Sequence, residues 1–229
     1  MDTHATHPTA HAEHAAVPPG VLDERLEDVR FGKATGGKVA MWIFIAQDGM
    51  AFGGLLLAYG LLRIFAGDNW PAPGMKPTDI LGIPLTALAT FILICSSVSM
   101  VLAVDNAQKA HRKNTVFWLA LTILGGLSFL GIQAFEYTHL AHEGIGLATS
   151  TFDGKPINSL FSTTFFVVTG FHGAHVTAGV IYLICILMGA MKGRYTKGGM
   201  SYSHVELVGL FWHFVDLVWI LVFTFIYLL

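Results

Sequence analysis

The chain alternates between long apolar stretches and short polar connections. An α-helix needs about 20 apolar residues to cross the hydrocarbon core of a bilayer. We predict membrane-spanning helices over residues 39–65, 80–104, 116–140, 160–188 and 203–229. The connection after the first stretch contains Pro71, Pro73 and Pro77, so it cannot be helical throughout and lies outside the hydrocarbon. The pattern indicates an all-α integral membrane bundle of five transmembrane helices over residues 38–229.

Residues 1–37 form a polar N-terminal tail with several prolines and four histidines that lie three, four and three residues apart. These are His4, His7, His11 and His14. The series is open to two interpretations, a metal site or a solvated tail, and the second is favoured because no rigid scaffold holds the rings. We expect the tail to be largely disordered, with a short amphipathic piece over about 21–31 on the membrane surface. No apolar stretch precedes Lys38, so no signal peptide is expected.

The composition supports a membrane protein. Hydrophobic residues make up 54% of the chain and charged residues 12%, which lies outside the range of soluble domains. The net charge is −2, and the basic residues form no stripe, so we expect no nucleic-acid partner. Cys95 and Cys185 lie in apolar stretches and are expected to behave as small apolar residues.

The basic residues predict the orientation, because cytoplasmic connections are rich in Lys and Arg. Ten of the 13 fall on one side if the chain crosses the membrane five times: Arg25, Arg30, Lys33, Lys38, Lys109, Arg112, Lys113, Lys192, Arg194 and Lys197. The other side holds Arg63, Lys76 and Lys155. We therefore predict a cytoplasmic N-terminus and a periplasmic C-terminus. A missed helix would scramble this alternation.

Ionisable residues lie in or at the ends of the apolar stretches: Asp48, Glu136, His172, His175, Glu206, His213 and Asp216. Such groups are costly in a membrane and must face protein or water. At about 1.5 Å per residue, those of the first, fourth and last stretches reach a similar depth, which predicts a common buried polar layer. Gly49 and Gly53 form a GxxxG pair that favours close helix packing, and Ser96, Ser97 and Ser99 can hydrogen-bond between helices.

Three interpretations of this layer compete. His172 or His175 could ligate a haem together with His213, although aromatic neighbours crowd these positions. A proton-coupled transporter could use Asp48 as its titrating group, although no broken helix or internal repeat is apparent. Alternatively, His213 and Asp216 hydrogen-bond one another and fix the helix register.

Three segments together resemble subunit III of the haem–copper respiratory oxidases: residues 133–137 (QAFEY), 170–176 (GFHGAHV) and 211–219 (FWHFVDLVW). The resemblance runs from about Lys38 to Leu229. Residues 41–48 (MWIFIAQD) resemble the family segment with a carbodiimide-reactive carboxyl, which is usually glutamate in cytochrome c oxidases and is Asp48 here. The chain is similar to the five-helix bacterial form, which lacks the two helices that wall the lipid cleft.

The resemblance implies a non-catalytic subunit without haem or copper of its own, in the bacterial inner membrane. Its expected partners are catalytic subunit I, which carries haem and copper, subunit II and a small subunit IV. The complex would be a proton-pumping oxidase that reduces oxygen to water with electrons from cytochrome c or quinol, and this subunit would support its stability and proton uptake. Asp48 and the C-terminal residues resemble the quinol group. Related chains accompany nitric oxide reductases, which leaves a second assignment open.

The resemblance also implies bound phospholipid. The residues expected to contact it are Trp42, Arg63, Lys192 and Arg194. Membrane lipids are therefore expected partners in addition to the other subunits.

Overall fold

The computed structural model describes residues 36–147, 151–152, 154–195 and 202–229. Its long helices are α1 (Gly36–Ala66), α3 (Ile83–Gln108), α4 (Arg112–His142), α5 (Ser159–Met191) and α6 (Ser203–Val222), which a π-helix, η3 (Phe223–Leu228), extends. These are five helices, within the described residues, that are long and apolar enough to cross a membrane. The predicted five-helix membrane bundle is confirmed. The N-terminal histidine series and the amphipathic piece over 21–31 lie outside the described residues.

Short elements fill the connections at one end of the bundle. After α1 come a 3-10 helix, η2 (Gly67–Asn69), and the single turn α2 (Pro77–Ile80), so the proline-rich connection is not continuously helical, as expected. Pro77 and Pro84 both occupy the first turn of a helix, where a missing amide proton is tolerated. The strands β1 (Thr151–Phe152) and β2 (Lys155–Pro156) form an antiparallel hairpin that the sequence pattern did not indicate.

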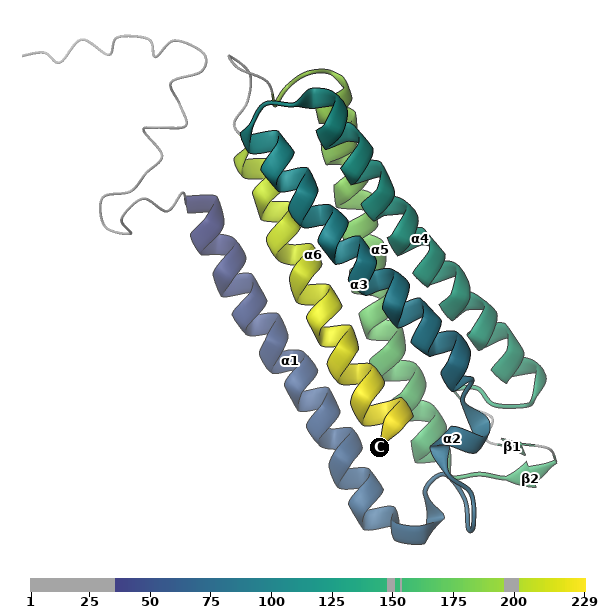
Figure 1. The fold of residues 1–229 in the computed structure, drawn as a ribbon. Coiled ribbons are helices and arrows are strands. Elements are labelled where there is room, and N and C mark those ends of the chain that lie inside the picture. Colours follow the sequence, from purple (N-terminus) through teal and green to yellow (C-terminus); the bar gives the residue numbers. More distant parts are fainter. Residues whose placement is uncertain (1–35, 148–150, 153, 196–201) are drawn as a thin grey trace, which may run out of the picture.

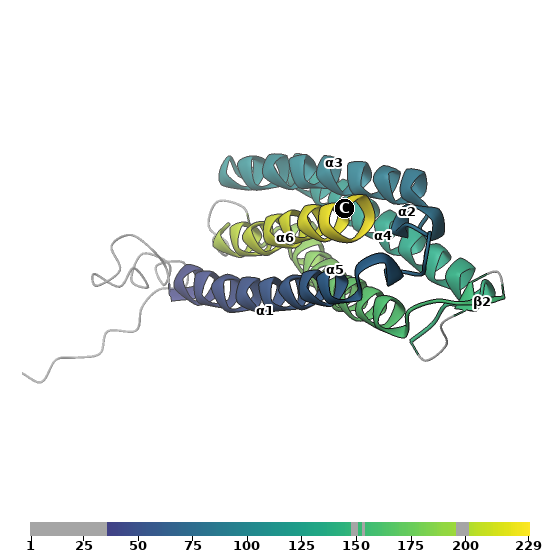
Figure 2. The same cartoon turned by 90° about the horizontal axis from the view of Figure 1, so that it is seen from below.

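The helix α6 lies between α1 and α3, with α4 and α5 behind this layer (Figures 1 and 2). It packs against α1, α3 and α5, while α3 packs mainly on α4. Of the five spans, α6 buries the largest share of its residues and α1 the smallest. The last helix is thus the centre of the described bundle, and α1 is peripheral.

Two glycines, which have no side chain, let α4 approach its neighbours closely. A Cβ on Gly125 would lie 2.6 Å from Ser96 Cβ on α3, and one on Gly126 would lie 2.6 Å from Trp212 Cη2 on α6. The GxxxG pair of α1 behaves differently. A Cβ on Gly49 would lie 3.7 Å from Phe214, but one on Gly53 would have no neighbour within 4 Å. The expectation that α1 packs tightly through this pair was wrong for the described part of the chain.

Hydroxyl groups on α3 hold it to α4 and α6. The indole N–H of Trp212 donates to Ser96 Oγ over 3.1 Å, and that of Trp219 donates to Thr90 Oγ1 over 2.9 Å. Ser99 Oγ lies 2.8 Å from Thr122 Oγ1 on α4. These bonds satisfy buried polar groups where no water is at hand, and they confirm the interhelical role predicted for the serines.

Candidate functional site

The carboxylate of Asp48 on α1 faces the imidazole of His175 on α5. Asp48 Oδ2 lies 3.2 Å from His175 Nε2, with side-chain exposures of 11% and 16%. The contact lies within ion-pair distance, but it is not aligned as a hydrogen bond. The structure thus pairs Asp48 with the fourth predicted span; the sequence placed the first, fourth and last spans in one polar layer but did not identify His175 as the partner of Asp48.

The second nitrogen of His175 bonds the backbone of its own helix. His175 Nδ1 lies 2.8 Å from the backbone oxygen of Phe171, and a carbonyl oxygen can only accept, so Nδ1 carries a proton. The Nε2 atom faces the Asp48 carboxyl, to which it can donate only as the second N–H of an imidazolium.

His172 is fully buried next to this pair. Its ring centroid lies 4.8 Å from that of Trp219 and 5.8 Å from that of Phe129, which meets it edge-on. Within the described residues neither ring nitrogen has a hydrogen-bond partner. The imidazole ring of His172 is therefore packed between helices. The neighbouring rings of Trp219 and Phe129 leave no space for a haem plane beside it.

His213 and Asp216 on α6 both face Ser97 on α3. Ser97 Oγ lies 2.6 Å from His213 Nδ1, and the same hydroxyl neighbours the Asp216 carboxylate. The direct hydrogen bond predicted between His213 and Asp216 was wrong, because the α3 hydroxyl takes that place. These residues therefore bond α6 to α3 and set the register between the two helices, instead of bonding to each other within α6.

Glu136 on α4 is buried between two hydroxyl groups. Thr86 Oγ1 on α3 lies 3.2 Å from its Oε1, and Tyr227 in η3 donates to its Oε2 over 3.0 Å. Only 7% of Glu136 is exposed. The wide turns of η3 place the Tyr227 hydroxyl at this point, and the sequence pattern did not identify either partner.

Polar contacts tie the helix ends together. At the end where α1 begins, Lys38 forms an ion pair of 2.8 Å with Glu206 at the start of α6, and Arg112 at the start of α4 bonds the Met191 carbonyl at the end of α5. At the opposite end Arg63 bonds the Leu229 carbonyl. The helices therefore alternate in direction as the sequence predicted.

The four predicted lipid contacts do not form one site. Trp42 is 60% exposed near the beginning of α1, and Lys192 and Arg194 are exposed at the same end of the bundle. Arg63 lies at the other end, beside the C-terminus. One headgroup could not contact all four residues.

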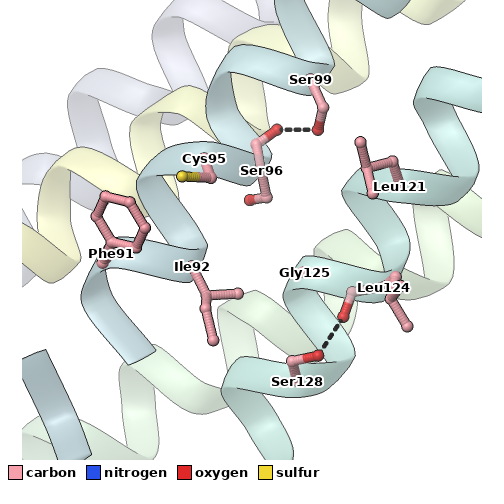
Figure 3. A pocket seen from close by; sticks show the side chains of 9 residues that line it. All are labelled: Phe91, Ile92, Cys95, Ser96, Ser99, Leu121, Leu124, Gly125 and Ser128. Atoms are coloured by element: carbon pink, nitrogen blue, oxygen red, sulfur yellow. Dashed lines mark hydrogen bonds between the residues drawn. The ribbon is translucent and has the colours of Figure 1, made fainter. Parts of the chain in front are cut away.

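Two shallow grooves run along the outside of α3. The α3–α4 groove, of about 310 Å³, is lined by Phe91, Ile92, Cys95, Ser96, Ser99, Leu121, Leu124, Gly125 and Ser128 (Figure 3). A groove of about 300 Å³ between α3 and α6 includes Asp105, Glu206 and His213. Across the described ranges, no group of three or more His, Cys, Asp or Glu residues could hold a metal ion.

A bundle of five spanning helices with paired carboxyl and imidazole groups at mid-depth defines a multi-pass membrane protein. Residues 28–229 match the family described as cytochrome c oxidase subunit III. The chain belongs to this family.

Relatives agree with this assignment. The chain is 32% identical over 208 residues to "Probable quinol oxidase subunit 3" of Staphylococcus saprophyticus, covering 90% of this chain and 96% of the relative. It is 31% identical over 209 residues to the protein of the same name in Staphylococcus aureus, with the same coverage. It is therefore subunit III of a haem–copper terminal oxidase, a multi-pass bacterial membrane protein that works in a complex with other oxidase subunits.

Proposed function

We propose that this chain is the non-catalytic subunit III of a proton-pumping quinol oxidase, bound to a catalytic subunit I that carries haem and copper. Subunit II and a small subunit IV are its further partners. The assignment of quinol as donor is supported by the names of the two relatives and by the aspartate at position 48. The observation that carries the proposal is the family match over residues 28–229, which include the whole membrane domain.

The orientation follows from the charges at the two ends. Among the described residues, Lys38, Lys109, Arg112, Lys113, Lys192 and Arg194 lie at the end where α1 begins, whereas Arg63, Lys76 and Lys155 lie at the other. The first end is cytoplasmic by the positive-inside rule. The C-terminus is then periplasmic, in the inner membrane.

The Asp48–His175 pair is the group through which this subunit supports proton uptake. It places a carboxyl and an imidazole about a dozen residues inside α1, roughly 18 Å from the helix start. Gain or loss of a proton by this pair changes its net charge, and that charge acts on the neighbouring subunit because a membrane screens charge weakly. The pair thus tunes proton entry into the neighbouring catalytic subunit.

Lipid at Trp42, Lys192 and Arg194 on one side, and at Arg63 on the other, supports complex stability.

Purification of the tagged chain from its own membranes in mild detergent tests this function. We expect haem-bearing subunits to co-purify, with quinol oxidase activity and an optical haem spectrum. A chain purified without haem would point to a free-standing transporter. If the purified complex oxidises cytochrome c, the electron donor is cytochrome c instead of quinol. If it reduces nitric oxide, the chain belongs to a nitric oxide reductase complex instead of an oxidase.

A further inference from the structure

The α3–α4 groove lies on the outside of the helix pair, at the depth of lipid acyl chains (Figure 3). Its lining residues lie about 9 to 17 positions from the cytoplasmic ends of α3 and α4, which is roughly 14–26 Å along the helices. A bilayer with its headgroups is about 40–45 Å thick. The groove therefore extends from the cytoplasmic leaflet to about the middle of the bilayer.

The width of the groove distinguishes a hydrocarbon chain from a helix as its occupant. Its volume is about 310 Å³, and it follows the helices for roughly 12 Å, the length of about eight helical residues. Its mean cross-section is therefore roughly 26 Å², at most about a third of that of a helix about 10–12 Å across. A second helix could insert only single side chains, whereas an extended acyl chain can lie along the whole groove.

The hydroxyl groups of the groove need no partner from outside the chain. Ser96 Oγ donates to a backbone carbonyl of its own helix and accepts the indole N–H of Trp212. Ser99 and Ser128 also donate to backbone carbonyls of their own helices, over 2.7 and 2.8 Å (Figure 3). Acyl chains offer no hydrogen bonds, so they can fill this groove without leaving a polar group unsatisfied. The groove between α3 and α6, by contrast, contains two acids and a histidine.

A cation lies between the groove and the cytoplasm on the same face of α4. Lys113 precedes Leu124 by 11 residues, about three turns, so the two side chains leave α4 in nearly the same direction. Lys113 is exposed, and no described carboxylate pairs with it. The axial distance between the two residues is roughly 17 Å, close to the roughly 15 Å of hydrocarbon in one leaflet. This spacing matches the distance from the headgroup of a lipid to the end of its acyl chain.

The charges at the α3–α4 turn indicate the kind of headgroup. Lys109 pairs with Asp105 over 2.7 Å, and Arg112 bonds the Met191 carbonyl. Lys113 is the one Lys or Arg of this turn for which the described residues supply no such partner. An ammonium group binds phosphate oxygens through charge-assisted hydrogen bonds, and basic residues at the cytoplasmic end of membrane helices attract anionic lipids. The complement of Lys113 is therefore a phosphate in a headgroup of net negative charge.

We propose that the α3–α4 groove binds an anionic phospholipid of the cytoplasmic leaflet. One acyl chain lies along Leu121, Leu124 and Gly125, and the phosphate lies at Lys113. None of the four residues predicted to contact lipid lines this groove, so the site is separate from those contacts. The leaflet depends on the proposed orientation, but the site does not depend on the oxidase function.

Ile181 on α5 provides a matched control position. It is 58% exposed, and Leu124 is 60% exposed. Ile181 lies ten residues before the end of α5, and Leu124 lies twelve residues after the start of α4. Both are thus at a similar depth from the cytoplasmic end of the bundle. Ile181 lines neither of the two grooves along α3, so it should contact only exchangeable lipid or detergent.

A photo-cross-linking amino acid at Leu124 or at Ile181 tests the acyl-chain site in the intact complex. The purified complex is washed extensively in lipid-free detergent and irradiated, and the adducts are identified by mass spectrometry. We expect phospholipid at position 124 and detergent at position 181. Detergent at both positions, phospholipid at both positions, or a peptide of another subunit at position 124 would overturn the proposal. Haem that still co-purifies in that case would leave the proposed function intact.

Lys113→Gln tests the headgroup site. The washed complex with the probe at position 124 is incubated with vesicles of phosphatidylglycerol, which is anionic, or of phosphatidylcholine, which is zwitterionic. We expect several-fold more adduct with phosphatidylglycerol, and we expect Lys113→Gln to abolish this preference. Lys155→Gln, an exposed lysine at the opposite end of the bundle, should keep it. Equal labelling by the two lipids, or a preference that survives Lys113→Gln, would overturn the proposal.

Discussion

Tyr227, two residues from the C-terminus, donates a hydrogen bond to the buried carboxylate of Glu136 at the far end of α4. The contact spans 91 residues of sequence and fixes the end of α6 to the helix pair behind it. Tyr227→Phe would leave Glu136 with Thr86 as its remaining described partner. We expect a loss of about 1 kcal/mol of stability, measured by denaturant titration of the purified complex.

The control is Tyr202→Phe, because Tyr202 is 40% exposed at the start of α6. A cycle with Glu136→Gln then separates the bond from other effects, since residues in direct contact give non-additive changes. Purely additive effects in the double variant would show that the Tyr227–Glu136 bond contributes nothing.

Gly126→Ala should destabilise the packing of α4 against α6. The added methyl would lie 2.6 Å from Trp212 Cη2 and 2.8 Å from Val180 Cγ2, and overpacking of this kind costs about 1–3 kcal/mol. Gly131→Ala on the same helix meets nothing within 4 Å and should be neutral or stabilising, because alanine favours helix by up to about 1 kcal/mol. Gly126→Ala should therefore lower the temperature of thermal unfolding, whereas Gly131→Ala should leave it unchanged or raise it; equal shifts would contradict the packing described.

The proposed orientation predicts which ends react with a membrane-impermeant maleimide. Lys155→Cys should be labelled in intact spheroplasts, because the β hairpin lies at the periplasmic end. Lys113→Cys should be labelled only after lysis. Both variants carry Cys95→Ala and Cys185→Ala, since both native thiols are exposed on the bundle surface. The reverse labelling pattern would invert the topology and place Asp48 nearer the periplasm.

The five helices could be predicted from the sequence because length and apolarity are local properties of each stretch. The pairing of polar residues could not, because it depends on how each helix is rotated. Asp48 and His213 lie at similar depth, but α1 turns Asp48 towards α5 and its partner is His175. His213 and Asp216 share a helix face, yet Ser97 on the neighbouring helix takes the place between them.

The predicted close packing of α1 and the π-helix at the end of α6 show two further limits of sequence reasoning. A GxxxG pair indicates that a backbone can approach, but not which chain supplies it, and Gly53 has no such neighbour within the described chain. The last helix changes to π geometry at Phe223, a choice that local propensity does not encode. That change is what brings Tyr227 to Glu136.

Asp48→Asn keeps the shape of the Asp48–His175 pair and removes its charge. An amide does not exchange a proton as a carboxyl does, so proton uptake should slow. We expect an unchanged haem spectrum, with fewer protons pumped per electron or faster inactivation during turnover. His175→Gln should have the same effect, and the double variant should be no worse than either single one, because the two residues act as a unit.

Asp68→Asn is the matched control, because Asp68 is an exposed acid outside the long helices. Proton release by oxygen-pulsed cells and the decay of activity over repeated turnovers are the two measurements. Normal pumping and lifetime in Asp48→Asn would reduce the Asp48–His175 contact to a packing role between α1 and α5. Additive losses in the double variant would mean instead that each residue acts through a separate partner, with His175 serving through its bond to Phe171.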